Sequence, residues 1–426
     1  MLIYTPHITN RLLYIVQTVL GKDAAITSNI DDFIAYPDFK INYSAVSITD
    51  KECFIQPHGL LFENCIKTQD IVCFEWNTIK VFFESGGDIP FDIFAASFYL
   101  ISRYEEYLLH QTDEYNRYGH VNSLAYKENF LHLPLVNLWW KEFEKITGYQ
   151  LPERKFSFVP TYDVDIAYAY RYQPLWKNVL GFYRDLLKAD FEKVIERGNV
   201  YSGKQKDPFD VYEWLDALHK ECHIQPVYFL MAIIERGEYD KNLKLSSRGL
   251  QRLYRRLAAT YDTGIHPTWR SGDKGSETLL LTEIEALNGL LKREITTSRQ
   301  HYLRFTLPDT FRKLIEAGIR KEYSMGYGNI NGFRASYCVP FFWYDLEKEL
   351  TTGLELHPFC FMDATAYFEQ KETAQQAAIE LQQYFDIVKM VQGKFICIFH
   401  NHFLTEQAEW IAWRKMYEGF LRANTC

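Results

Sequence analysis

The sequence predicts an α/β protein whose larger part is organised around a parallel sheet. From about residue 155 to the C-terminus, short apolar runs alternate with long amphipathic segments, which is the pattern of successive β-α-β units. A chain of 426 residues is also too long for one ordinary core, so we expect two domains. Seven strands, the number of an irregular β/α barrel, are predicted near 156–162, 225–232, 262–266, 296–302, 321–326, 353–357 and 394–400.

Residues 1–150 are predicted to form a small α/β domain of unknown role. Short β-prone runs at 2–5, 52–55, 70–74 and 78–83, with an amphipathic helix at 12–20, precede two helices at 91–110 and 133–146. A solvated helix face accounts for the polar residues Glu105, Glu106 and His110. The polar segment 151–155, interrupted by Pro152, is the predicted junction with a second domain spanning 151–426.

Long helical segments separate the strands of this second domain. Their apolar residues recur at the spacing of a helix that covers a sheet with one face. They are predicted near 174–198, 208–222, 246–261, 276–293, 309–318, 372–392 and 407–422.

Composition limits the classes of function. A formal net charge of -8 without a basic run argues against nucleic acid as a partner. No apolar run has the length of a membrane span, and the eight cysteines contain no CxxC pair. We therefore expect reduced thiols and a cytoplasmic protein, while the oligomeric state is not indicated.

Chemically capable side chains follow most of the predicted strands. In parallel barrels the active site lies at the carboxyl ends of the strands, so these residues are expected to converge. A single histidine at such a position is usually structural, but four strands ending in histidine and one in paired aspartates form a pattern. The residues are Asp163, Asp165, His266, His301, His357 and His400, with His402 close behind.

Asp163 and Asp165 are separated by one residue, and a turn at this point can bring both carboxylates to one site. A helix cap and a turn aspartate are the structural alternative. Asp-x-Asp pairs also hold Mg²⁺ in glycosyltransferases and phosphatases, whose sites contain few imidazoles. The histidines at neighbouring strand ends favour a transition metal such as Zn²⁺ instead.

The order of these motifs resembles the polysaccharide deacetylase family, which is built on an irregular seven-stranded β/α barrel. The segment Thr161-Tyr-Asp-Val-Asp165 is similar to the family's Asp-Asp motif with one residue inserted. The resemblance implies that Asp163 is the general base and that Asp165 is a metal ligand. Gly264-Ile-His266 resembles the start of the family's His-Ser/Thr-x-x-His motif, so His266 is an implied ligand, but Arg270 stands where the second histidine belongs.

The same resemblance assigns the remaining roles. Arg299 in Arg-Gln-His-Tyr is the implied partner that orients the base, and His357 in Leu-Glu-Leu-His is the implied general acid. Since a guanidinium cannot bind a cation, the third ligand must come from elsewhere. We expect His301, on the strand next to His266, with His400 and His402 as alternatives.

These residues predict a hydrolase of non-peptide C–N bonds that removes an acetyl group from an N-acetylated sugar of a polysaccharide or glycoconjugate. Zinc is the expected metal, with cobalt or nickel as alternatives. Arg334, His400 and Trp269 are the predicted contacts to the sugar. Two rival functions are an Asp-x-Asp glycosyltransferase or phosphatase using Mg²⁺ and a non-catalytic sugar-binding relative.

Overall fold

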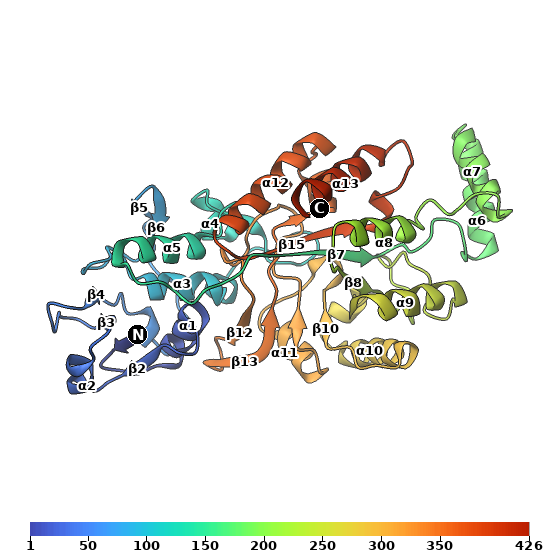
Figure 1. Ribbon diagram of the computed structural model, residues 1–426. Helices are drawn as coiled ribbons and strands as arrows, with labels where there is room; N and C mark the ends of the chain where they lie inside the picture. Colours follow the sequence, from blue (N-terminus) through green and yellow to red (C-terminus); the bar gives the residue numbers. More distant parts are fainter. Residues whose placement is uncertain (426) are drawn as a thin grey trace.

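The computed structural model describes residues 1–425, and all of them belong to an α/β fold with mixed sheets. Figure 1 shows the N-terminal elements at one end, the large sheet and its helices in the middle, and the pair α6 and α7 projecting at the other end. Cys426, one of the eight cysteines expected to be reduced, lies outside the described residues.

The N-terminal segment forms a small parallel sheet with helices around it. Its strand order within residues 1–425 is β2-β1-β3-β4, and β5 and β6 form a separate antiparallel hairpin. The strands are β1 (Leu2–Tyr4), β2 (Ala25–Thr27), β3 (Lys40–Tyr43), β4 (Cys53–Ile55), β5 (Phe74–Trp76) and β6 (Ile79–Val81). The helices are α1 (Asn10–Leu20), α2 (Ile30–Ala35), α3 (Ile93–Ile101), α4 (Leu124–Lys127) and α5 (Leu135–Thr147).

The second sheet contains the predicted parallel strands. Over the described residues its order is β12-β13-β11-β10-β9-β8-β7-β15-β14, and every pairing except β12 with β13 is parallel. The ladder ends at β12 and β14 without closing, so the closed seven-stranded barrel stays a prediction. The predicted runs correspond to β7 (Ser157–Val164), β8 (Val227–Leu230), β9 (Asp262–Ile265), β10 (Thr297–Ser298), β11 (Lys321–Glu322), β13 (Leu350–Leu356) and β15 (Lys394–His400), whereas β12 (Phe341–Asp345) and β14 (Phe361–Met362) were not predicted.

Helices follow β7, β8, β9, β10, β14 and β15 and surround the sheet (Figure 1). Their buried residues follow the helical spacing, as in α9, where Gly249, Leu250, Leu253, Tyr254 and Leu257 face inward. The helices are α6 (Leu175–Leu187), α7 (Phe191–Tyr201), α8 (Tyr212–Glu221), α9 (Arg248–Thr260), α10 (Glu277–Leu291), α11 (Asp309–Glu316), α12 (Ala374–Met390) and α13 (Ile411–Thr425).

The N-terminal segment packs against the β12–β13 hairpin. Tyr14 Oη on α1 donates a hydrogen bond of 2.9 Å to the Phe342 carbonyl. The buried Arg11 pairs with Glu349 at the turn of the hairpin. The expected solvated face is wrong for Glu105 and Glu106: both carboxylates are buried, because Arg103 neutralises them.

Two further features concern membrane spans and thiols. Within residues 1–425 no helix has both the length and the apolar character needed to cross a bilayer. Six described cysteines are free, but Cys222 is disulfide-bonded, so the expectation of reduced thiols is wrong at this position.

Candidate functional site

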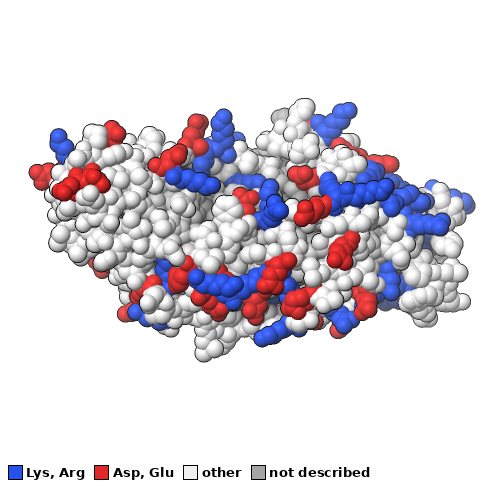
Figure 2. All heavy atoms as spheres, turned by 90° about the horizontal axis from the view of Figure 1, so that it is seen from below, with Lys and Arg blue, Asp and Glu red and all other residues white. Residues whose placement is uncertain are grey.

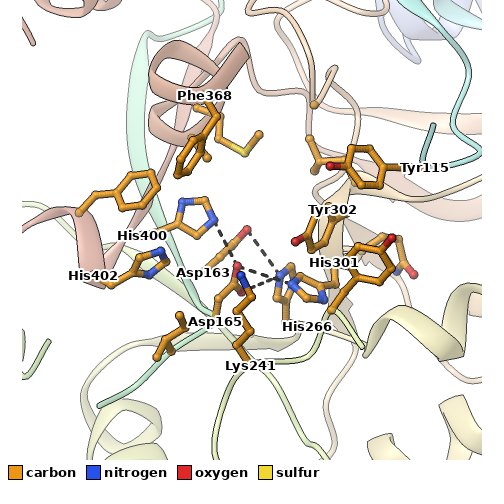
Figure 3. Close-up of a pocket in the computed structure, with 18 of the residues that line it drawn as sticks. Tyr115, Asp163, Asp165, Lys241, His266, His301, Tyr302, Phe368, His400 and His402 are labelled. Atoms are coloured by element: carbon orange, nitrogen blue, oxygen red, sulfur yellow. Dashed lines mark ion pairs between the residues drawn. The ribbon is translucent and has the colours of Figure 1, made fainter. Parts of the chain in front are cut away.

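One cavity collects the polar side chains that follow the strands. Its volume is about 410 Å³, within the range of roughly 300–1,000 Å³ that is common for small-molecule sites. Strand register explains the convergence, because His400 of β15 pairs with Asp163 of β7 and Ser298 of β10 pairs with Ile265 of β9. Figure 3 shows the two aspartates between His400 and His402 on one side and His266 and His301 on the other.

Asp165, His266 and His301 form the candidate metal centre. Their ligand atoms all lie within 4.8 Å of one another. His266 Nε2 is 3.2 Å from Asp165 Oδ1, and His301 Nε2 is 3.6 Å from Asp165 Oδ2. The Oδ1 atom is buried and accepts no hydrogen bond from the described residues, which is costly unless a cation is bound there. The donor set therefore fits a divalent transition metal.

The second nitrogen of each histidine around Asp165 is fixed by an acceptor. This arrangement sets the tautomer and leaves the Nε2 atom free to face Asp165, as in histidines that ligate metals. The Nδ1 group of His266 donates to the Arg299 carbonyl at 2.7 Å. The Nδ1 group of His301 donates to Asp240 at 3.2 Å, and that of His400 donates to Asp363 at 2.6 Å.

Asp163 is held by the guanidinium of Arg299. The distance from Arg299 Nη1 to Asp163 Oδ1 is 2.8 Å, and both side chains are buried. Arg299 is itself fixed, because its Nε donates to the Tyr323 carbonyl and its guanidinium lies 4.2 Å from the centre of the Phe229 ring. Asp163 Oδ2 is turned towards His266, 3.8 Å from its Nε2. One oxygen is thus anchored while the other faces the cavity.

His400 lies across the cavity from His301. Asp363 accepts hydrogen bonds from both the backbone N–H and the Nδ1 of His400, at 2.7 and 2.6 Å. The Nε2 atom of His400 lies 3.5 Å from Asp165 Oδ2. Asp363 can accept these hydrogen bonds because it directly follows β14, the short strand that pairs with β15.

The charges within the site shift three pKa values. Burial would raise the pKa of Asp165, but His301 and His266 outweigh it and lower that pKa well below its usual range. Burial would lower the pKa of His301, yet Asp165 and Asp240 raise it to about 9. For His400, burial is likewise outweighed by Asp363, which raises the pKa to about 10.

His357 is not in the cavity, which corrects the expectation for this residue. Its Nε2 bonds Glu355 at 2.8 Å, its Nδ1 is 3.4 Å from Lys394 Nζ, and its ring stacks on Tyr323. The reason is the period of two that continues from β13: residues 355 and 357 point the same way, and the half-buried Glu355 does not line the cavity either.

Arg334 is also misplaced by the sequence prediction. Its guanidinium is buried against Glu106, with distances of 2.8 and 2.6 Å, and it donates to the Gly326 carbonyl. All these bonds are internal to the protein, and Arg334 does not line the cavity. Its position links the N-terminal segment to the second sheet.

Three further predicted residues are located at or near the rim. Arg270 is exposed and lies 3.7 Å from Glu235, outside the candidate metal centre. Trp269 stands one layer behind the cavity wall, where its ring packs against Tyr239 and Tyr302. His402 lines the cavity, and burial lowers the pKa of its imidazole to about 3.

Sequence reasoning missed several residues of the site, among them Asp363, Asp240, Lys241 and Tyr115. Asp363 follows a short apolar run, so the strand-end rule applied to 361–363 would have found it. Asp240 and Lys241 lie in the long loop after β8, and Tyr115 belongs to the N-terminal segment; no spacing signal connects these positions to the strand ends.

Comparisons with known proteins give a family for the N-terminal segment and weak likenesses for the rest. Residues 1–152 match a family model described as "Family of unknown function (DUF7033)". Among curated proteins, none matches the chain.

Solved structures similar to the chain include polysaccharide deacetylases. A putative polysaccharide deacetylase from Mycobacterium smegmatis is 13% identical, with 65% of this chain and 88% of that chain covered and a TM-score of 0.41. A probable polysaccharide deacetylase from Pseudomonas aeruginosa PAO1 is 12% identical, with 63% and 85% covered and a TM-score of 0.40. Puue allantoinase is 11% identical, with 65% and 90% covered and a TM-score of 0.41. At these identities and TM-scores, the likenesses carry no argument about activity.

Proposed function

We propose that this protein is a metal-dependent hydrolase that removes the acetyl group from an N-acetylated sugar. The observation that carries the proposal is the convergence of Asp165, His266 and His301 beside a carboxylate, Asp163, that is anchored by Arg299. The resemblance of these strand-end motifs to the polysaccharide deacetylase family supports the same activity.

Asp165 and the Nε2 atoms of His266 and His301 would hold the metal. A divalent transition metal at such a centre supplies Lewis acidity, which lowers the pKa of water and polarises a carbonyl group. Zinc is the proposed ion because two imidazoles and one carboxylate are a common ligand set of catalytic zinc sites. The carbonyl of Arg299 and the carboxylate of Asp240 orient the two imidazoles.

Asp163 is the proposed general base. Its Oδ2 atom faces the cavity and accepts the proton of the attacking water, while Arg299 holds the Oδ1 atom in place. The attack forms a C–O bond at the acetyl carbon and moves the carbonyl electrons onto oxygen.

His400 is the proposed general acid, in place of His357. Asp363 keeps the imidazole protonated, and the Nε2–H is directed into the cavity on the side opposite His301. When the C–N bond breaks, this proton passes to the departing amine. Acetate and a free sugar amine result.

The cavity wall supplies contacts for a sugar ring. Tyr115, Tyr302 and Phe368 line it, and Figure 3 shows their rings above the metal centre. Aromatic rings stack on the apolar faces of pyranoses. Tyr115 comes from the N-terminal segment, so this segment contributes to the proposed substrate site.

The rival functions are less well supported by the side chains. Mg²⁺ enzymes prefer oxygen ligands, whereas two of the three ligands here are imidazoles. A non-catalytic relative is favoured only if the ligand missing at Arg270 has no substitute. The Nε2 atom of His301, 3.6 Å from Asp165 Oδ2, offers one.

The test is to purify the protein with Zn²⁺ or Co²⁺, measure its metal content and follow acetate release from N-acetylated chitooligosaccharides and from lipid-linked and nucleotide-linked N-acetyl sugars. Acetate release that depends on the metal and is lost in Asp163→Asn supports the proposal. Turnover of phosphate esters or nucleotide sugars with Mg²⁺ alone would reject it.

A further inference from the structure

Helices α6 and α7 form a hairpin that projects from the body of the protein (Figure 1). The hairpin is inserted between β7 and α8, directly after the segment that carries Asp163 and Asp165. A connection of this length is far longer than a β/α unit needs, which is typical of an insertion with its own role.

The interior of this hairpin is polar. Arg197 of α7 donates to Asp185 at 2.6 Å and to Asn178 at 3.3 Å, both on α6, and all three side chains are buried. Gly181 permits the contact, because a Cβ atom there would lie 2.6 Å from the Arg197 guanidinium. Hydrogen-bonded charges therefore dominate the contact between the two helices, and Val200 is the one apolar side chain of the pair that is buried.

The outer surface of the hairpin is apolar. A water-exposed helix pair normally has the opposite arrangement, with apolar residues between the helices and polar residues outside. Leu187 is 87% exposed and Trp176 is 60% exposed. The other apolar side chains on this surface are Leu175, Val179, Leu180, Phe182, Tyr183, Leu186, Phe191, Ile195 and Tyr201. An exposed apolar patch of this size marks an interaction surface.

The charge of the hairpin is opposite to that of the whole chain. Residues 171–206, which are the hairpin together with the loops that flank it, contain eight Lys and Arg and four Asp and Glu, a net charge of +4, whereas the chain carries -8. Figure 2 shows Lys and Arg side chains bordering an uncharged surface at the end of the molecule that carries the hairpin. Lys188 and Lys204 lie exposed after the ends of α6 and α7, respectively.

The base of the hairpin is fixed to the candidate site. The buried carboxylate of Asp207 accepts three backbone N–H bonds of 2.8 Å, from Ala169, Tyr170 and Arg171. These residues follow Asp165 in the same loop, so the base of the hairpin is hydrogen-bonded to the segment that leaves the carboxyl end of β7.

We propose that the α6–α7 hairpin docks the protein on the surface of an anionic lipid bilayer. Helices that lie in the membrane interface have this composition: one surface carries Trp, Tyr, Phe and Leu, and Lys and Arg surround it. Lipid acidic headgroups complement the net charge of +4, whereas two copies meeting through this surface would repel each other. Docking does not depend on the proposed deacetylation, and it would hold the candidate site close to lipid-linked sugars.

The experiment is sedimentation of the full-length protein with phosphatidylcholine vesicles that do or do not contain phosphatidylglycerol. We expect binding to the anionic vesicles that weakens as salt is raised. The triple variant Leu180→Gln, Tyr183→Gln, Leu187→Gln should bind at least about tenfold more weakly, because the apolar contact is lost. Lys188→Glu combined with Lys204→Glu should lower binding to anionic vesicles specifically.

The matched control replaces exposed apolar residues outside the hairpin, with Val72→Gln and Ile379→Gln, which are 72% and 61% exposed in the wild type. This control should bind like the wild type, and circular dichroism should show that all variants are folded. Absence of binding to anionic vesicles, or equal binding by the triple variant, overturns the proposal. A concentration-dependent dimer in sedimentation velocity that the triple variant abolishes would also overturn it, since a second copy would then cover the surface.

Discussion

The imidazole of His301 faces the carboxylate of Asp165, and its Nε2 atom lies 3.6 Å from Asp165 Oδ2. Arg270, which stands where the resemblance places a second histidine ligand, is turned outward towards Glu235. The two positions follow neighbouring strands, since Arg270 comes after β9 and His301 comes after β10, and of the two only His301 faces Asp165. Three predictions concern this centre and the groups that act beside it.

Removing the His301 imidazole should lower metal content and activity together. We expect His301→Ala to bind metal at least about 100-fold more weakly, since one of three protein ligands is lost, and excess Zn²⁺ should restore part of both properties. Metal analysis of the purified variant and a metal titration measure the effect. Arg270→Ala is the control and should keep its metal. Full metal occupancy in His301→Ala would exclude this ligand and favour His400.

The two aspartates should separate metal binding from catalysis. Asp163→Asn should lower the rate by roughly 10²–10⁴-fold and leave metal content unchanged, because only its proton-accepting role is lost. Asp165→Asn should lower both, since this carboxylate contacts both imidazoles of the centre. Metal content and kcat measured on the same preparations decide the point. Equal loss of metal in both variants would contradict the division.

His400 should set the basic limb of the pH profile. As a proton donor it must be protonated, so activity is lost as the pH rises through its pKa, which Asp363 and Asp165 raise against burial to about 10. Asp363→Asn removes the largest stabilising charge and should shift the basic limb to lower pH. The limb is measured from kcat/KM against pH, and an unshifted limb would argue against this acid.

The same assignment can be tested with the leaving group. His400→Gln should slow amide hydrolysis by roughly 10²–10⁴-fold and affect activated acetate esters far less, because their leaving groups need no proton. His357→Gln is the matched variant and should leave both substrates nearly unaffected. A selective amide defect in His357→Gln instead would restore the original assignment.

The strand-end pattern was the strongest signal in the sequence. Asp163, Asp165, His266, His301 and His400 follow four strands, and parallel register alone brings them to one cavity. The sequence predicted these strands because their apolar runs are bounded by turns and separated by amphipathic helices.

The remaining features depend on tertiary geometry. His357 obeys the strand-end pattern but faces Glu355, since a position at the end of a strand does not determine which side of the sheet a side chain takes. β14 is only two residues long, so its pattern is too short to detect, although it places Asp363 beside His400. The burial of Glu106 follows from Arg103 and from Arg334, 228 positions away.

Tyr115 should contribute to substrate binding and not to chemistry. Its ring lies 5.2 Å from Tyr302 in the cavity wall, so loss of a stacking surface should raise KM by roughly 3- to 10-fold in Tyr115→Ala with little change in kcat or metal content. Tyr126→Ala, in the same segment but outside the cavity wall, is the control. If KM is unchanged for every acetylated sugar tested, Tyr115 and the N-terminal segment do not contribute to substrate binding.

The last prediction concerns stability and the buried carboxyl of Glu322. Glu322 accepts hydrogen bonds from the N–H and the Oγ of Ser324, whose Oγ in turn accepts the N–H of Gln300 beside His301. Burial raises the pKa of Glu322 from 4.5 to about 7, although Ser324 and Arg299 oppose the shift. The folded protein therefore binds this proton more tightly than the unfolded chain does. The stabilisation is complete below pH 4.5 and is lost as the pH rises to 7.

A shift of this size corresponds to about 3 kcal/mol in the free energy of unfolding. Glu322→Gln has no proton to lose, so the difference in unfolding free energy between variant and wild type should move in favour of the variant by about that amount from pH 4.5 to pH 7. Urea denaturation at a series of pH values measures it, with Glu294→Gln on the exposed surface as the control. A constant difference across this range would mean that Glu322 ionises in the folded protein as it does in the unfolded chain. Ser324 and Gln300 connect Glu322 to the end of β10, where His301 lies. The metal affinity of Glu322→Gln, measured at one fixed pH, therefore shows whether this carboxyl positions His301.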